Sequence, residues 1–174
     1  MSFRIEEKVV CTAWELSNLQ ASLKARGMRR LFPRRKVESL YFDNAVNGMF
    51  ADSEEGSLPR KKIRVRHYDD NLGNKSLEIK VSSVEGRFKT TEPISSDRFC
   101  GISSKGLVDR MYGVCRPKLT VSYARDYFSF QGIRITFDTG IRYRKFNSSW
   151  EKTDYLNVVE LKAPDRKSTR LNSS

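Results

Sequence analysis

The chain has 174 residues, of which 38% are hydrophobic and 31% charged, and its formal net charge is +12 at pH 7. This length and composition predict one soluble globular domain with its own hydrophobic core. The charge predicts a polyanionic partner, so the classes to separate are nucleic acid, an anionic membrane surface and a phosphate-rich small molecule. No apolar run approaches the roughly 18 residues of a membrane-spanning helix, and the N-terminal residues lack a signal-peptide core.

Strand patterns dominate the sequence. Turn-forming residues separate the segments, and several connections are too short for a crossover helix, so we expect an antiparallel sheet. The eight segments expected as strands are 3–10, 37–43, 60–68, 76–82, 86–92, 118–128, 133–139 and 156–162.

Two stretches are expected to be helical. Leu16, Leu19 and Leu23 lie on one side of a helix that Ser17 can cap and Gly27 can end. A second, weaker helical segment is expected within residues 96–114, around residues 106–112. The predicted fold class is therefore mainly β, an α+β protein whose antiparallel sheet has one or two flanking helices.

The cysteines and the histidine argue against a metal site of the zinc type. Cys11, Cys100 and Cys115 are odd in number and follow no metal-binding spacing, which predicts reduced thiols in a cytoplasmic protein. His67 is the single histidine, and no Cys/His cluster is present.

The segment 60–68 places four cations on one face of a strand, and apolar residues occupy the other face. The cations, at every second position, are Arg60, Lys62, Arg64 and Arg66. Neighbours of this kind lie about 7 Å apart and repel by roughly 0.6 kcal/mol in bulk water. By itself, this strand fits an ordinary solvated face as well as an anion-binding face.

Other expected strands repeat this division into an apolar and a charged face. If the sheet closes on itself, the charged faces line an interior that must be wet or filled by an anion. Arginine and lysine suit phosphate oxygens, whereas a carboxylate beside phosphate needs a divalent cation such as Mg²⁺ or Mn²⁺. The charged residues that share a face within a strand are Arg4, Glu6 and Lys8; Glu78 and Lys80; Arg87 and Lys89; Arg134 and Asp138; and Glu160 and Lys162.

Seven short motifs are spread along nearly the whole of residues 3–162. They are RIEEK at 4–8, SLYFDN at 39–44, RKKIRVRHY at 60–68, LEIK at 77–80, RPKLTVSYARDYF at 116–128, RITFD at 134–138 and VVELK at 158–162. Together and in this order they resemble the VTC (vacuolar transporter chaperone) polyphosphate polymerase domain of the triphosphate tunnel metalloenzyme superfamily. The resemblance implies an eight-stranded antiparallel β tunnel, or barrel, with a basic lumen.

The resemblance also implies roles for individual residues, and a Mn²⁺ or Mg²⁺ cofactor. The phosphate-binding residues would be Arg64, Arg66, Lys80, Lys89, Arg125 and Arg134, with Lys8 and Lys62 as additions. The metal ligand would be Glu160, with Glu6 and Glu78 as weaker candidates. Further weaker candidates for the site are Arg4, Arg60, Arg87, Asp138 and Lys162, and Asp138 could instead be the ion-pair partner of Arg134.

The activity implied is transfer of the γ-phosphate of ATP to a growing inorganic polyphosphate chain. Such a reaction needs positioning and charge neutralisation more than a protein nucleophile. Two alternatives stay open: a tunnel triphosphatase that hydrolyses inorganic or organic triphosphates, and a non-catalytic binder of polyphosphate or another polyanion. Arg4 stands where the adenylate cyclase/thiamine triphosphatase (CYTH) branch has a glutamate, which favours the polymerase-like branch. Nucleic acid is not expected as a partner, because aromatic residues such as Tyr41 and Tyr127 lie within strands rather than on an exposed basic surface.

The last ten residues, 165–174, can be back-translated into a common short-read sequencing adapter, and we interpret them as a non-native tail. Residues 1–164 are then a single VTC-like domain. We expect this domain to be incomplete at its C-terminus, because the family continues after VVELK with a helix and a segment that supplies another tunnel lysine.

Overall fold

The computed structural model describes residues 4–69 and 74–164 of the chain. These residues belong to two compact units, each with its own hydrophobic core. Unit 1 comprises Met1–Arg35, Tyr123–Ile141 and Thr153–Ser174, and unit 2 comprises Lys36–Ser122 and Arg142–Lys152. The predicted tail, residues 165–174, lies outside the described residues, and its origin stays a prediction.

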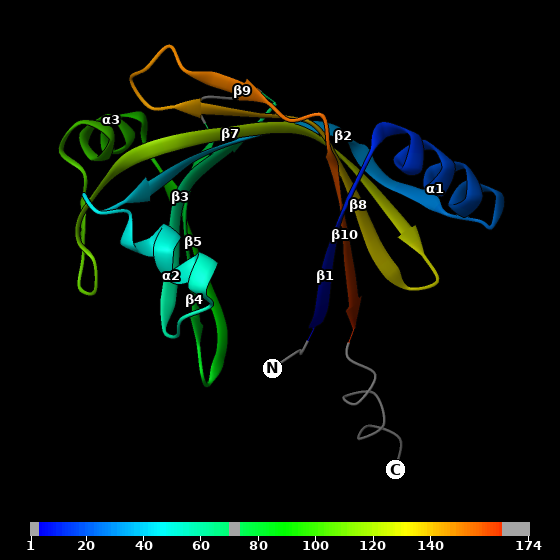
Figure 1. Cartoon of the computed structure of the whole chain (residues 1–174), viewed down its shortest axis with the longest axis horizontal. Coiled ribbons are helices and arrows are strands. Elements are labelled where there is room, and N and C mark those ends of the chain that lie inside the picture. The colour runs from blue at the N-terminus through cyan, green and yellow to red at the C-terminus, as the bar shows by residue number, and fades with distance from the viewer. Residues whose placement is uncertain (1–3, 70–73, 165–174) are drawn as a thin grey trace. The chain divides into compact units, whose positions relative to one another are not determined.

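Strands make up most of the described chain, and the predicted mainly β fold class is confirmed (Figure 1). The helices are α1 (Ala13–Ala25), α2 (Gly48–Glu55) and α3 (Ser96–Lys105). The strands are β1 (Arg4–Cys11), β2 (Arg29–Asp43), β3 (Arg60–Tyr68), β4 (Lys75–Ser83), β5 (Gly86–Ile94), β6 (Leu107–Asp109), β7 (Gly113–Phe130), β8 (Ile133–Lys145), β9 (Glu151–Thr153) and β10 (Asn157–Pro164).

The strands pair in the order β1-β10-β8-β7-β2-β3-β4-β5, with β6 beside β7 and β9 beside β8. Within unit 1, β1 pairs with β10 and β10 with β8, and within unit 2, β2, β3, β4 and β5 pair in succession; all of these pairings are antiparallel. The order has two ends among the described residues, β1 and β5, so the described strands form an open sheet rather than a closed barrel.

In unit 1, α1 covers the apolar face of the strands. Leu16 from α1 packs with Phe137 from β8 and Val159 from β10, and all three are buried. Thr12 begins the helix with a capping box, in which its hydroxyl accepts from the backbone N–H of Glu15 and the Glu15 carboxylate accepts from the backbone N–H of Thr12. The prediction that Ser17 caps this helix is therefore wrong, because the helix begins at Ala13 and Ser17 lies inside it.

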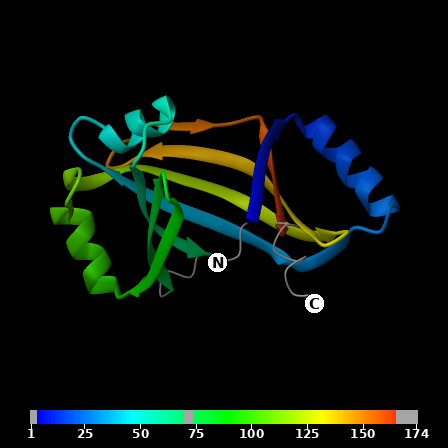
Figure 2. The same ribbon diagram turned by 90° about the horizontal axis from the view of Figure 1, so that it is seen from below.

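In unit 2, the apolar faces of β2, β3 and β4 form a second core. Leu40, Ile63, Val65 and Leu77 are buried in it. Helices α2 and α3 both lie beside these strands (Figure 2) and add apolar side chains to the core, among them Met49. Because the apolar residues alternate along each strand, the other face of the same strands carries the charged residues.

The structure departs from the sequence prediction in its short elements. Helix α2 lies between two expected strands, in a stretch where no helix was predicted. It is stabilised at its start by the Asp43 carboxylate, which accepts from the backbone N–H groups of Met49 and Phe50 at 2.9 Å. The second predicted helix lies within 96–114 as expected, but it is α3 at 96–105, and residues 106–112 contain the short strand β6 instead. Strands β6 and β9, of three residues each, were too short for an alternating pattern to reveal.

Candidate functional site

The charged face of unit 2 is organised around Glu78 on β4. Strand register places Arg64 of β3 between Tyr41 of β2 and Glu78 of β4. Arg64 donates from Nε to Glu78 at 2.7 Å and from Nη1 to the Tyr41 hydroxyl at 3.0 Å. Lys89 of β5 donates to the other Glu78 oxygen at 2.6 Å. One buried carboxylate therefore holds two cations from the strands on either side.

Glu78 and Arg64 are both charged at neutral pH. Burial raises the pKa of Glu78, but the hydrogen bond from Lys89 and the charge and hydrogen bond of Arg64 outweigh it and hold that pKa at about 2. Burial lowers the pKa of Arg64, but Tyr41 and Glu78 outweigh it and raise that pKa above its ordinary value. The Glu78 cluster thus has more positive than negative charge.

Arg66 lies next to this cluster on the same face of β3. Its Nε donates to the hydroxyl of Ser39 at 2.9 Å, and both residues are buried. The Ser39 contact fixes the direction of the guanidinium, which is what a preorganised anion site requires.

Three lysines form a row across the same face. Register places Lys62 of β3 opposite Lys80 of β4, and Lys80 opposite Lys89 of β5. All three are exposed. Side chains directly opposite one another on paired strands lie about 5 Å apart, and like charges at that distance destabilise the sheet. An anion bound over the row would remove this repulsion.

Two weaker candidates, Arg60 and Arg87, lie at the end of this face. Both are opposite Ser82 of β4. The Arg60 guanidinium donates at 3.1 Å to the backbone carbonyls of Gly56 and Ser57. Arg60 therefore stabilises the turn before β3.

The charged face of unit 1 alternates in sign across three strands. Register places Lys8 of β1 opposite Glu160 of β10, and Glu160 opposite Thr136 of β8. In the next row, Lys162 of β10 lies between Glu6 of β1 and Arg134 of β8. For Arg4, at the start of β1, the structure describes only the backbone.

Ion pairs link the carboxylates of unit 1. Arg125 of β7 donates to both oxygens of Asp138, at 2.5 and 2.6 Å, and lies 3.4 Å from Glu160. Lys162 lies 2.6 Å from Glu160 and 3.5 Å from Glu6. The suggested pairing of Asp138 with Arg134 is wrong. The partner of Asp138 is Arg125, because β7 presents that side chain directly to it.

Glu160 is ionised although only 3% of its surface is exposed. Burial raises its pKa, but hydrogen bonds with Glu6 and Lys162 and the charges of Lys162 and Lys8 outweigh burial and hold the pKa well below the usual range. An ionised, buried carboxylate supplies the hard oxygen donor that Mg²⁺ and Mn²⁺ prefer, so its chemistry fits such a cation.

The other predicted metal ligands are placed differently. Glu6 lies within the same group of ion pairs as Glu160, whereas Glu78 belongs to unit 2 and is held by Arg64 and Lys89. In the part of the chain that the structure describes, no three His, Cys, Asp or Glu side chains are grouped as a metal site. Glu160 therefore stays the leading candidate among the predicted ligands, and a bound cation there would draw most of its ligands from elsewhere.

Sequence reasoning missed several residues that shape these clusters. Tyr41 and Ser39 orient Arg64 and Arg66, and Tyr123 lies under Arg125 with its ring centroid 5.2 Å from the guanidinium carbon. Tyr41 and Ser39 are two residues apart on β2, so they share one face. This spacing is the sequence pattern that could have identified them.

A family model described as the VTC domain matches residues 3–173. The chain belongs to the VTC domain family. The match includes most of the predicted non-native tail. A comparison with curated proteins gives no match. Within the described residues, no helix is both long and apolar enough to cross a membrane.

Solved structures share the fold of this VTC domain. A candidate adenylate cyclase from Bacillus halodurans is 11% identical, with a TM-score of 0.65 over 97% of this chain and 84% of its own. An adenylyl cyclase-like protein from Hippeastrum, described as having a dominant triphosphatase activity, is 14% identical, with a TM-score of 0.58 over 98% and 83%. A protein from Pyrococcus horikoshii is 11% identical, with a TM-score of 0.55 over 97% and 82%. At these identities the likeness establishes only that this chain shares the fold of these proteins.

Proposed function

We propose that this VTC domain is a metal-dependent phosphotransferase that moves the γ-phosphate of ATP to a growing inorganic polyphosphate chain. The observation that carries the proposal is the preorganised cationic face of unit 2. There, Arg64, Arg66 and Lys89 are each held by Glu78 or Ser39, and the row of lysines follows beside them. A chain of phosphates carries repeated negative charges, which complement the surplus positive charge of this face.

The chemistry needs electrostatic stabilisation rather than a protein nucleophile. Phosphoryl transfer proceeds through a transition state whose charge is spread over the phosphate oxygens, so cations fixed in advance lower its energy. In unit 2, Arg64 and Arg66 would orient the phosphates, and in unit 1, Arg125, Arg134 and Lys8 would do the same. Lys62 and Lys80, which are exposed, would add positive charge screened by solvent.

Glu160 would hold the Mn²⁺ or Mg²⁺ ion, which when bound neutralises charge on the phosphate oxygens. In the protein as described, Lys162 and Arg125 neutralise Glu160, so cation binding requires these side chains to shift or share the carboxylate. Both side chains end in charged groups that can donate hydrogen bonds to phosphate oxygens instead, so the exchange leaves no charge unpaired.

A cavity of about 500 Å³ in unit 2 supports a nucleotide as the phosphate donor. Tyr41 and Lys62 of the charged face line it together with apolar side chains, including Met49, Phe50 and Leu119. An inorganic polyphosphate has no apolar surface to place there, whereas a nucleoside has a flat ring of suitable size.

A tunnel triphosphatase is the second candidate, and the likeness to the Hippeastrum protein favours it. The two reactions differ in the acceptor, which is phosphate in the first and water in the second. Incubating the protein with ATP and Mn²⁺ and resolving the products separates them. Polyphosphate supports the polymerase, free phosphate alone supports the triphosphatase, and neither product contradicts both.

The control variant for this assay is Arg64→Ala/Arg66→Ala. We expect it to lose polyphosphate binding and activity while keeping the fold, because Lys89 stays bound to Glu78. A folded double variant with parental binding would contradict the placement of the phosphates on unit 2.

A further inference from the structure

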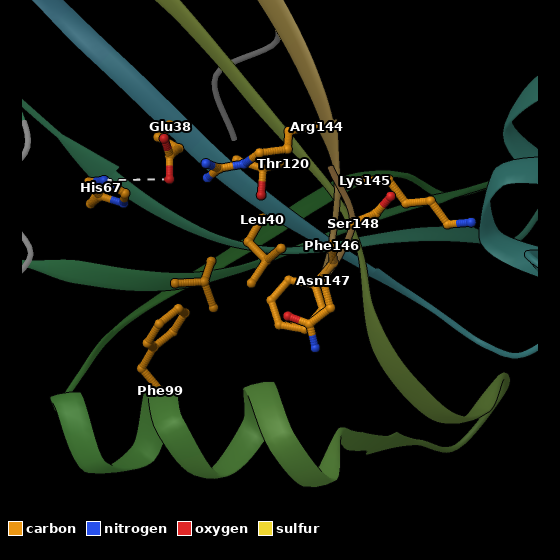
Figure 3. Close-up of a pocket in the computed structure, with 11 residues that line it drawn as sticks. Glu38, Leu40, His67, Phe99, Thr120, Arg144, Lys145, Phe146, Asn147 and Ser148 are labelled. Carbon is orange, nitrogen blue, oxygen red and sulfur yellow. Dashed lines mark ion pairs between the residues drawn. The ribbon is translucent and has the colours of Figure 1, made fainter. Parts of the chain in front are cut away.

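A cavity of about 320 Å³ lies in unit 2 on the side of the sheet opposite the phosphate face (Figure 3). Glu38 and Leu40 of β2 line it, opposite His67 and Val65 of β3 in the register. Each of these residues is next in sequence to a residue of the charged face, and strand alternation therefore sends its side chain to the other side. The cavity and the phosphate site are distinct, with the sheet between them.

The cavity has an apolar half and a polar half. Leu40, Val65, Phe99 and Phe146 are part of the hydrophobic core of unit 2 or pack against it, and they supply the apolar lining. Figure 3 shows the rings of Phe99 and Phe146 on one side. The volume of the cavity is at the lower end of the range for small-molecule sites, roughly 300–1,000 Å³. The cavity therefore suits one small molecule rather than a nucleoside triphosphate.

The polar half contains groups of both charges. Glu38 Oε1 lies 4.0 Å from His67 Nε2, and the Glu38 side chain is 29% exposed. Figure 3 shows the Arg144 guanidinium directed toward the side that holds Glu38, near Thr120, and the Lys145 ammonium directed away from it. A ligand in this half therefore meets one carboxylate and one guanidinium.

We propose that this cavity binds an α-amino acid with an apolar side chain, through the Glu38 carboxylate and the Arg144 guanidinium. The ammonium group donates to Glu38, the carboxylate accepts two hydrogen bonds from Arg144, and the side chain packs on Phe99 and Phe146. A simple anion would be repelled by Glu38 and a simple cation by Arg144, whereas a zwitterion satisfies both.

The turn after β8, which forms one wall of the cavity, has a defined backbone conformation. Asn147 has a φ of 51°, a left-handed conformation that asparagine tolerates better than most residues. The backbone N–H of Phe146 donates to Lys118 at 2.9 Å, and that of Lys145 donates to Trp150 at 3.2 Å. These bonds fix the backbone that carries Phe146 and Asn147, two of the residues that line the cavity.

The experiment is a titration of the intact chain with L-phenylalanine, followed by ligand-observed NMR and by the shift in thermal midpoint. The matched ligands are 3-phenylpropionate, which lacks the ammonium group, phenethylamine, which lacks the carboxylate, and glycine, which lacks the side chain. We expect L-phenylalanine to bind at least tenfold more tightly than each of them, because each omits one contact. Equal binding of 3-phenylpropionate or phenethylamine would overturn the zwitterion assignment, and no phenylalanine binding would overturn the site.

Two variants test the residues directly. Glu38→Gln and Arg144→Gln should each weaken L-phenylalanine binding at least tenfold, whereas Arg142→Gln, on the same strand but not lining the cavity, should leave binding unchanged. If either cavity variant unfolds, its melting curve will reveal this, and the ligand series on the parent protein still decides. Arg64→Ala/Arg66→Ala should retain phenylalanine binding. The experiment can therefore disprove the proposed phosphate site without disproving the proposed amino-acid site, and the reverse.

Discussion

Lys61 and Lys62 are adjacent in sequence but lie on opposite faces of β3, which makes them a matched pair for testing the phosphate site. Lys62 is exposed and lies in the lysine row opposite Lys80. Lys61 is paired with Asp109 at 2.8 Å on the other face, and the Asp109 side chain is only 9% exposed. We compare Lys62→Gln with Lys61→Gln, because both substitutions remove the same charge.

Lys62→Gln should weaken phosphate binding without cost to stability. Two unit charges about 5 Å apart repel by roughly 0.8 kcal/mol in water, so the substitution relieves at most about that much repulsion with Lys80. For a chain of this size this corresponds to a rise in thermal midpoint of up to about 3 °C, which falls as salt screens the charges. Loss of one charged contact with phosphate costs about 1.5–3 kcal/mol, or roughly 10- to 150-fold in Kd.

Lys61→Gln should have the opposite effect. Asp109 keeps the backbone N–H donors of Met111, at 2.8 Å, and Tyr112, at 3.3 Å, but loses its charged partner. We expect a cost of about 1–3 kcal/mol, which lowers the thermal midpoint by roughly 2–12 °C. Phosphate binding should not change, because Lys61 lies on the far side of the sheet.

The assay is calorimetric titration with inorganic tripolyphosphate at low and physiological salt, together with melting curves with and without the ligand. We expect opposite results for the two variants: Lys62→Gln loses affinity and keeps its stability, and Lys61→Gln keeps its affinity and loses stability. Two variants with the same affinity loss would mean that net charge, and not a face of β3, attracts the phosphate. Loss of affinity in Lys61→Gln alone would place the site on the other face.

Three further predictions concern the carboxylates and the chain end. Glu160→Gln should reduce Mn²⁺ affinity in the presence of triphosphate and preserve the fold; an unchanged affinity in a Mn²⁺ titration would remove Glu160 from the metal site. The folded-state pKa of Glu78, about 2, lies below its ordinary value of 4.5. The unfolded state therefore takes up the proton first, so stability from ionised Glu78 is present above about pH 4.5 and is lost as pH falls toward 2. Urea midpoints should show this fall in the parent but less of it in Glu78→Gln, and equal slopes would contradict it. Deleting residues 165–174 should leave the thermal midpoint unchanged if the segment is a non-native tail, and a clear drop would indicate that it packs on the domain.

The sequence by itself determined which residues share a face of each strand. In the observed register, Lys62, Arg64 and Arg66 share one face of β3, whereas Ile63 and Val65 share the other, as alternation along 60–68 predicts. Glu160 and Lys162 likewise share a face of β10 opposite that of Val159 and Leu161. The physical reason is that a strand repeats every two residues whatever its neighbours are. The mainly β class and the charged faces follow from this local rule, and the antiparallel pairing follows from connections too short for a crossover helix.

Only the tertiary structure decided which charges meet. Glu78 joins Arg64 and Lys89, and Arg125 joins Asp138 rather than leaving it to Arg134, because these contacts depend on the register between strands. Local periodicity contains no information on register. Helix α2 was likewise missed, because its start depends on the Asp43 carboxylate reaching six and seven residues along the chain. The small cavity at Glu38 and Arg144 needs β2, β3, β7, β8 and α3 together, and only packing of the whole unit creates it.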